Sequence, residues 1–328
     1  MSSETVSPEM TPQVPLWVHR FAVLTACATL GLIFVGGLVT STGSGLAVPD
    51  WPLSFGQVFP PMVGGVLYEH GHRLVAAFVS VLTVTLAVLL SNWEPRAWVR
   101  RLGLGALAAV LIQGSLGGLT VLLRLPTSVS VTHACLAQVF FCLTVTIAVC
   151  TSPRWLSSRE VGAETTGLSL HVLTRVTVGL VFGQLLLGAL MRHTGAGLAI
   201  PDFPLAFGRI IPPFESQGVL IHFLHRAGAL VVAIAISWTV ARVLSVFGSE
   251  AQLRRPALAL FALLMLQLTL GALAIWTQRA VTPMTAHVAV GAAVLATSVM
   301  LALRTTRLVG PRTSQMQSQT LISERVTA

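Results

Sequence analysis

Four histidines occupy matching places in the two halves of the chain. His72 and His133 lie 61 residues apart in the first half, and His225 and His287 lie 62 residues apart in the second. Each falls near one end of an apolar run that is long enough to cross a bilayer. Imidazole nitrogens bind metals, and ionisable side chains inside a membrane are candidates for function.

The chemistry that suits these histidines best is ligation of haem iron. Two imidazoles that face each other at similar depth in a four-helix bundle can supply both axial ligands of a haem. The interiors of the apolar runs hold neither carboxylates for a di-iron site nor a Cys/His cluster for zinc. Hydrogen bonding between helices is the alternative role for such histidines. The repetition of both pairs favours haem.

Two arginines directly follow candidate ligands, Arg73 after His72 and Arg226 after His225. Such cations could pair with haem propionates at the outer surface, or could simply extend to the membrane interface. The remaining histidines either lie at the inner surface or lack a histidine at the matching position, so we do not expect them to be ligands. These are His19, His70, His171 and His193.

The two halves differ three residues before the first ligand, where Glu69 stands in one half and His222 in the other. A carboxylate beside a haem can act as an acid or a base, or can orient water. The alternative is that Glu69 is only an acid at a helix start, where acids are favoured. The asymmetry predicts chemistry in the first half and retention of a cofactor in the second.

A Gly- and Pro-rich stretch precedes each pair. Residues 37–61 and 189–213 align without gaps and are identical at 14 of 25 positions. A period of about 150 residues indicates a duplicated domain rather than a solenoid. Asp50 and Asp202 lie in the copied stretches, and we expect them to cap a short helix or to tie the loop through Asx-type hydrogen bonds.

The elements that position these residues are transmembrane helices. Of 328 residues, 54% are hydrophobic and 9% are charged, whereas about a quarter are charged in soluble domains. We therefore expect an all-α membrane protein with eight transmembrane helices, arranged as two pseudosymmetric four-helix bundles. The predicted spans are residues 19–40, 65–90, 102–122, 128–150, 173–193, 218–244, 257–277 and 283–303.

The domain plan follows from the spans. We expect a cytoplasmic tail at 1–18, an N-terminal bundle at 19–150, a cytoplasmic linker at 151–172, a C-terminal bundle at 173–303 and a cytoplasmic tail at 304–328. All 20 basic residues are arginines, and 14 of them fall on one side when the N-terminus is placed inside. The positive-inside rule thus predicts cytoplasmic termini, so the net charge of +9 reflects topology and not nucleic-acid binding.

The chain resembles the haem A synthase family. The resemblance rests on GGLVTSTGSGLAVPDWP, then EHGHR, THA, HRAGAL and TAHVAVGA in this order, and it covers about residues 19–303. The family converts haem O to haem A, by oxidising a methyl to a formyl group, for terminal oxidases. It has two pseudosymmetric bundles.

The resemblance implies a role for each site residue. His225 and His287 would ligate a permanent haem b, His72 and His133 would ligate the substrate haem O, and Glu69 would be the catalytic acid. The implied partners are haem O synthase and an electron donor, in a multi-pass protein of the cell membrane; homo-oligomerisation is left open.

One departure concerns cysteine. Many bacterial members have a cysteine pair in the first outer loop, whereas this chain has no cysteine between Cys27 and Cys135. All four cysteines fall in spans, so we expect them to act as small apolar side chains. Two other functions fit the histidines: a di-haem cytochrome b that passes electrons from quinol without modifying haem, and a haem carrier or oxidase assembly factor.

Overall fold

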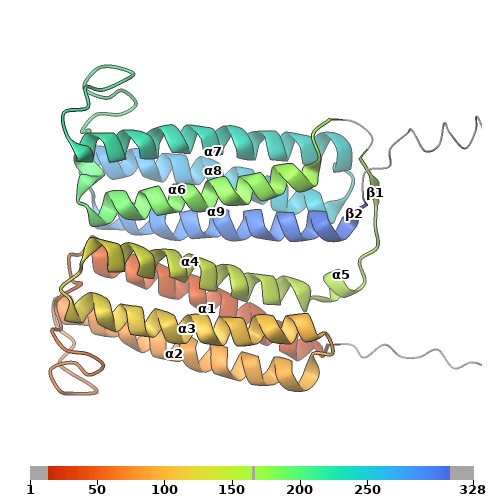
Figure 1. Ribbon diagram of the computed structural model, residues 1–328, viewed down its shortest axis with the longest axis horizontal. Helices are drawn as coiled ribbons and strands as arrows, with labels where there is room; N and C mark the ends of the chain where they lie inside the picture. The colour runs from red at the N-terminus through yellow and green to blue at the C-terminus, as the bar shows by residue number, and fades with distance from the viewer. Residues whose placement is uncertain (1–13, 165–166, 311–328) are drawn as a thin grey trace, which may run out of the picture.

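The computed structural model describes residues 14–164 and 167–310, and it consists of two groups of long helices lying side by side (Figure 1). The first group runs from red to yellow in the figure and the second from green to blue. The helices of the first group are α1 (Leu16–Ser41), α2 (Gly65–Trp93), α3 (Ala97–Leu122) and α4 (Thr127–Cys150). Those of the second are α6 (Leu170–His193), α7 (Gln217–Phe247), α8 (Ala251–Trp276) and α9 (Val281–Leu308).

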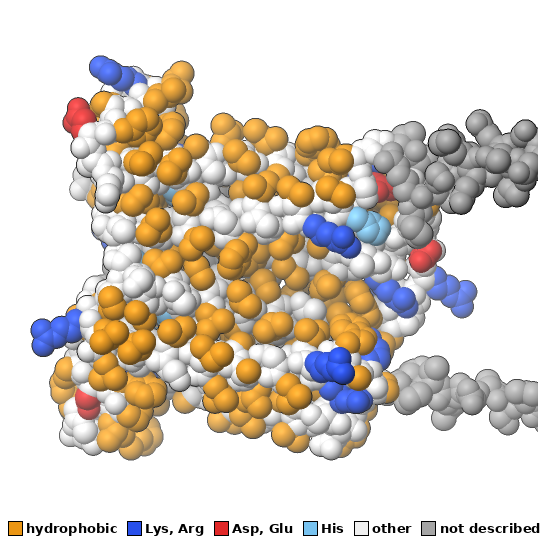
Figure 2. Space-filling view, in the orientation of Figure 1, with side chains coloured by type: hydrophobic (Ala, Val, Ile, Leu, Met, Phe, Trp, Pro, Cys, Tyr) orange, Lys and Arg blue, Asp and Glu red, His pale blue; other side chains and the backbone are white. Residues whose placement is uncertain are grey.

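These eight helices, counted over the described residues, are long and apolar enough to cross a membrane. The predicted fold class of eight transmembrane helices is thereby confirmed. Apolar side chains cover the flanks of both groups (Figure 2), as expected of surfaces that face lipid. Several helices begin earlier than the apolar runs do, because residues such as Arg100 and Arg254 join the first helical turns.

Each group packs as a four-helix bundle. In the first bundle α1 and α3 each pack against both α2 and α4, and in the second α6 and α8 each pack against both α7 and α9. The helices α2 and α4, which carry the first histidine pair, therefore occupy opposite corners of their bundle, as α7 and α9 do in theirs. The bundles meet where α1 packs on α9, α4 on α6, and α4 on α9.

The two copied stretches fold alike. The carboxylate of Asp50 accepts hydrogen bonds from the backbone N–H groups of Phe55 and Gly56, at 2.7 and 2.8 Å. Asp202 accepts the corresponding bonds from Phe207 and Gly208, at 2.7 and 2.9 Å. The prediction that these acids tie their loops is confirmed. The N–H donors hold the pKa of each carboxyl below its ordinary value, because they stabilise the ionised form.

The linker between the bundles pairs with the residues that directly follow α9. A short helix, α5 (Pro153–Leu156), follows α4, and strand β1 (Gly162–Ala163) pairs in parallel with β2 (Val309–Gly310). The predicted cytoplasmic tails lie largely outside the described residues, since only 14–18 and 304–310 of them are described.

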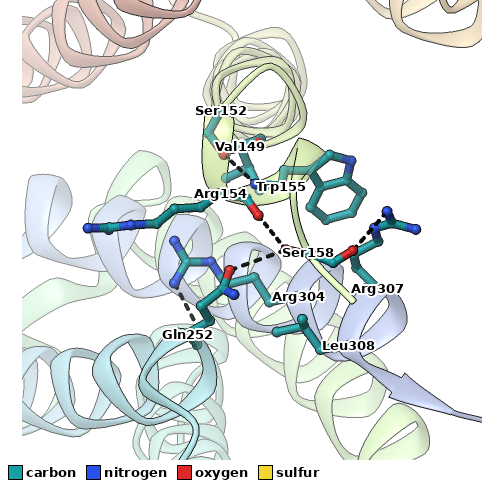
Figure 3. A pocket seen from close by; sticks show the side chains of 9 residues that line it. All are labelled: Val149, Ser152, Arg154, Trp155, Ser158, Gln252, Arg304, Arg307 and Leu308. Atoms are coloured by element: carbon teal, nitrogen blue, oxygen red, sulfur yellow. Dashed lines mark hydrogen bonds between the residues drawn. The ribbon is translucent and has the colours of Figure 1, made fainter. Parts of the chain in front are cut away.

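A small hollow lies beside this pair of strands and is lined by residues from the ends of α4 and α9 (Figure 3). Arg304 donates to the carbonyl of Gln252 at 2.8 Å, and Arg307 donates to that of Ser158 at 3.1 Å. These bonds fasten the linker and the start of α8 to α9. None of the residues predicted to ligate haem lines this hollow.

Candidate functional site

Each bundle brings its two predicted ligands together. His72 on α2 and His133 on α4 lie close enough to interact electrostatically, and so do His225 on α7 and His287 on α9. All four rings are partly buried. Since each pair comes from opposite corners of a bundle, the space between the two rings is the centre of that bundle. The structure thus brings the two members of each pair toward one another, and their ligation of iron stays a prediction.

Each of these rings lies against a glycine of the neighbouring helix. A Cβ atom built on Gly36 would lie 3.0 Å from Cε1 of His72, and one on Gly188 would lie 3.1 Å from Cε1 of His225. On the other side of each bundle, a Cβ built on Gly117 would lie 3.2 Å from Cε1 of His133, and one on Gly271 would lie 3.2 Å from Cε1 of His287. A side chain at any of these positions would force the ring to shift by a few tenths of an ångström.

Most of the rings have a nitrogen without a partner. Nδ1 of His72, His133 and His287 is buried and makes no hydrogen bond to any described residue. Buried polar atoms are nearly always paired, so orphans at a suspected site call for an explanation such as an absent ligand. The imidazoles of each pair face each other and lie against glycines. No third His, Cys, Asp or Glu is grouped with them among the described residues. This arrangement fits the two axial positions of a haem iron.

Glutamines support three of the four histidines. Gln113 donates to the backbone carbonyl of His133 at 2.9 Å, and the matching Gln267 lies 3.2 Å from Nε2 of His287. Gln184 donates to the carbonyl of His225 at 2.8 Å and lies 3.1 Å from its Nδ1. The polar contacts around the rings are thus not the same in the two bundles.

Glu69 is buried and uses both carboxylate oxygens. Oε1 accepts from Arg73 at 2.7 Å, and Oε2 accepts from the backbone N–H of Val48 at 2.8 Å. In the second bundle the N–H of Ile200 donates to Nδ1 of His222, at 3.2 Å. Glu69 and His222 therefore hold the same point of their loops. Glu69 also lies almost one helical turn before His72, on the side of the loop.

The arginines that follow the ligands reach into the loops. Arg73 donates to the carbonyls of Asp50 and Leu53, both at 2.8 Å. Arg226 donates to the carbonyls of Asp202 and Leu205, at 2.7 and 2.9 Å. Both guanidinium groups fasten the loop to the helix, and a contact with propionates stays a prediction.

Three of the remaining histidines make structural contacts, and one of them, His19, places its Nδ1 3.4 Å from the hydroxyl of Thr151. The Nδ1 of His70 lies 2.8 Å from the hydroxyl of Ser54 and so helps to hold the first loop. The carbonyl of His193, at the end of α6, accepts a weak bond from Thr127 at 3.4 Å, which joins the two bundles. His193 also lies close enough to His133 to interact with it electrostatically.

Sequence reasoning missed the four histidine-facing glycines and the contacts of Arg192. Arg192 donates to the carbonyl of Gly37 and to the hydroxyl of Ser41, both at 2.8 Å, and so links α6 to α1 across the bundles. The glycines could have been found from the repeat itself, because Gly36 and Gly188 occupy matching positions. Arg192 has no counterpart in the first half, so the repeat gave no signal for it.

Comparison with known proteins agrees with this geometry. The family of cytochrome oxidase assembly proteins, COX15-CtaA, matches residues 64–299, which is well over half of the chain. The chain belongs to this family. The matched region includes both histidine pairs, Glu69 and the loop of the second bundle.

Several curated members of the COX15-CtaA family resemble the chain over most of its length. The heme A synthase of Symbiobacterium thermophilum is 32% identical over 257 residues, which cover 76% of this chain and 82% of the relative. The heme A synthase of Halalkalibacterium halodurans is 30% identical over 240 residues, covering 68% and 77%. That of Shouchella clausii is 29% identical over 255 residues, covering 72% and 82%.

Proposed function

We propose that this protein is a haem A synthase of the cell membrane. It would oxidise a methyl group of haem O to the formyl group of haem A, the haem of terminal oxidases. Membership of the COX15-CtaA family and the names of the relatives support this proposal. The excess of arginines on one side supports cytoplasmic termini, with the histidine pairs toward the outer face.

The two bundles would divide the work. The second bundle would hold a permanent haem b through His225 and His287, and the first would receive haem O through His72 and His133. When bound, haem b supplies one-electron redox chemistry. The observation that carries this division is that both bundles present facing histidines against glycines, while only the first places a carboxylate, Glu69, beside its pair.

Glu69 would act as the acid or base of the reaction. Its Oε1 and Oε2 already accept hydrogen bonds from Arg73 and Val48, so the carboxylate is held at a fixed place almost one turn from His72. A proton can be taken up at Oε1 once the bond from Nη2 of Arg73 is released, while Nη1 keeps its two loop carbonyls. The carboxylate would then accept protons that are released as the substrate methyl is oxidised.

The first loop would shield this site from water. The ring of Trp51 lies against α3, where a Cβ built on Gly118 would come within 2.7 Å of its Cε2 atom. In the second bundle the ring of Phe203 meets that of Trp276, with ring centres 5.9 Å apart. Each loop thus lays an aromatic ring over the outer end of its bundle. Haem O synthase and a membrane electron carrier remain the partners we expect.

The test is to express the chain in a host that makes haem O but no haem A, and to chromatograph the extracted haems. We expect haem A only when the chain is present, and none with the Glu69→Gln variant. A Glu160→Gln variant, altered in an acid of the linker far from both histidine pairs, is the control. Tight binding of haem B with no new haem species would contradict the proposal and leave a di-haem cytochrome.

A further inference from the structure

Arg192 joins the two bundles near the outer ends of their helices. Its guanidinium leaves the last turn of α6 and donates to α1, at the carbonyl of Gly37 and the hydroxyl of Ser41. The matching residue of the first half is Thr40. The second bundle therefore carries a cation at the junction that the first bundle lacks.

This cation has no acidic partner among the described residues. The ion pairs there are Glu69–Arg73, Glu94–Arg96 and Glu164–Arg242, and Arg192 is in none of them. Its Nε is buried and makes no hydrogen bond to a described residue. A charge held near the membrane interior without a counter-ion is costly, so an anion is expected to accompany it.

The guanidinium lies beside the second histidine pair. Ser41, which accepts from Arg192, also accepts from the hydroxyl of Thr285 at 2.9 Å. Thr285 stands two residues before His287 on α9. A Cβ built on Gly37, the other acceptor, would lie 3.5 Å from Val288, the residue after His287. Arg192 and His287 are close enough to interact electrostatically.

We propose that Arg192 binds a carboxylate of the molecule held between His225 and His287, namely a propionate of haem b. This inference rests on the proposed function. Nη2 of Arg192 already donates to α1, which leaves Nη1 to give a carboxylate a charge-assisted N–H···O bond, and such bonds are among the strongest in proteins. Arg226 fits this task less well, because both of its terminal nitrogens already donate to loop carbonyls.

The contact would connect the cofactor of one bundle to the backbone of the other. The propionate, the guanidinium and the carbonyl of Gly37 would form one hydrogen-bonded chain that ends in α1. Gly37 directly follows Gly36, the glycine that faces His72. Haem b bound in the second bundle would thereby stabilise α1, the helix that packs against the ring of His72.

The experiment compares haem B with haem B dimethyl ester, in which both propionate carboxylates are esterified. The full chain with His72→Ala and His133→Ala, which leaves only the second site, is prepared without haem in nanodiscs of phosphatidylcholine. Each haem is then titrated in by absorbance. We expect haem B to bind at least about tenfold more tightly than the ester, as for the loss of a charged hydrogen bond.

Variants test whether Arg192 is the residue that causes the preference for haem B over its dimethyl ester. Arg192→Gln should bind both haems equally, and Arg192→Lys should keep part of the preference for haem B. Arg209→Gln, which alters an exposed arginine of the second loop, is the matched control and should keep all of it. Because each ratio is taken within one variant, a general loss of stability cancels.

Three results would overturn the inference. The first is an unchanged preference in Arg192→Gln. The second is an equal weakening of the binding of both haems with an unchanged ratio of their affinities, which would give Arg192 a structural role only. The third is a preference that disappears in nanodiscs of phosphatidylglycerol, which would show that a lipid phosphate occupies the site. If neither haem binds with two histidine ligands, the proposed function fails as well.

Discussion

The two bundles differ most clearly at a single point of contact between loop and helix. In the first, the N–H of Val48 is held by Glu69; in the second, the N–H of Ile200 is held by His222. An imidazole can also anchor the loop. Anchoring alone therefore does not explain an acid in the first bundle, and the difference supports chemistry there.

A second difference concerns how firmly the ligands are held. His225 is contacted by Gln184, and a Cβ on the nearby Gly228 would come into collision with the Gln184 carboxamide. The first bundle has Leu32 and Val75 at the matching positions, and Nδ1 of His72 has no partner among the described residues. A fixed ring suits a retained cofactor, and a less constrained ring suits a substrate that must enter and leave.

The largest effects are expected from removing one ligand of each bundle. His72→Ala and His225→Ala should both reduce haem A formation to background, since each takes away an axial ligand. Only His72→Ala should keep a tightly bound haem B after purification. Haem extraction and chromatography of the two variants checks this, and equal haem B in both would contradict the division of work.

The next test exchanges the loop anchors. Glu69→His should lower haem A formation by about 10²- to 10⁴-fold, the usual contribution of an acid–base group, while the protein stays folded because His222 shows that a histidine can serve there. His222→Glu is the matched control and should keep most of the activity. Rates of haem A formation and melting temperatures are compared. Full activity in Glu69→His would remove the acid–base role.

The glycines beside the rings should matter equally in both bundles. Gly36→Ala and Gly188→Ala place a Cβ about 3 Å from a histidine ring, and we expect each to weaken haem binding at its own site by about tenfold, as for other groups that orient metal ligands. Gly31→Ala on α1, where a Cβ meets nothing within 4 Å, is the control. Titration with haem B measures all three.

A smaller effect is expected when the second bundle is made to resemble the first. Gln184→Leu should speed the transfer of haem B to apomyoglobin by about three- to tenfold, which corresponds to the loss of one hydrogen bond. It should also alter the electron paramagnetic resonance signal of the low-spin haem, since the ring of His225 can rotate. Leu186→Gln, at an exposed position of α6, is the control. Unchanged transfer and spectrum would make Gln184 a packing residue only.

The smallest effect concerns the loops, and it should be the same in both. The carboxyls of Asp50 and Asp202 have a lowered pKa, so their stabilisation is full above the ordinary aspartate value of about 4 and is lost as pH falls through the lower value. Asp50→Ala and Asp202→Ala should each flatten the acid limb of a melting-temperature profile. A marked difference between the two variants would show that the loops are not equivalent.

The sequence predicted most of the fold because hydrophobicity decides it. The apolar runs gave eight helices in the right places, and the repeat placed His72 near His133 and His225 near His287. The loop acids were also predicted correctly, since Pro-Asp sequences form local Asx-type bonds. These features depend on residues close in sequence or on periodicity.

The parts that were not predicted depend on which helices are neighbours. That Gly36 faces His72 follows from the packing of α1 on α2, and no periodicity specifies it. The strand pair of β1 with β2 joins residues almost 150 positions apart and spans only two residues on each side. Arg192 lies near the end of the predicted span 173–193, but its partners on α1 belong to the other half of the chain.

The contacts between the bundles have a consequence for the ancestry of the protein. In the repeat, α1 corresponds to α6 and α4 corresponds to α9. The contact of α1 with α9 therefore corresponds to the contact of α6 with α4, and the contact of α4 with α9 corresponds to itself. This pattern of contacts is consistent with the isologous interface of a symmetric homodimer. An ancestral gene for one four-helix chain could have made the whole assembly from two copies. In such a fusion each copy is free to change alone, and Glu69 and Arg192 are two positions at which the halves differ.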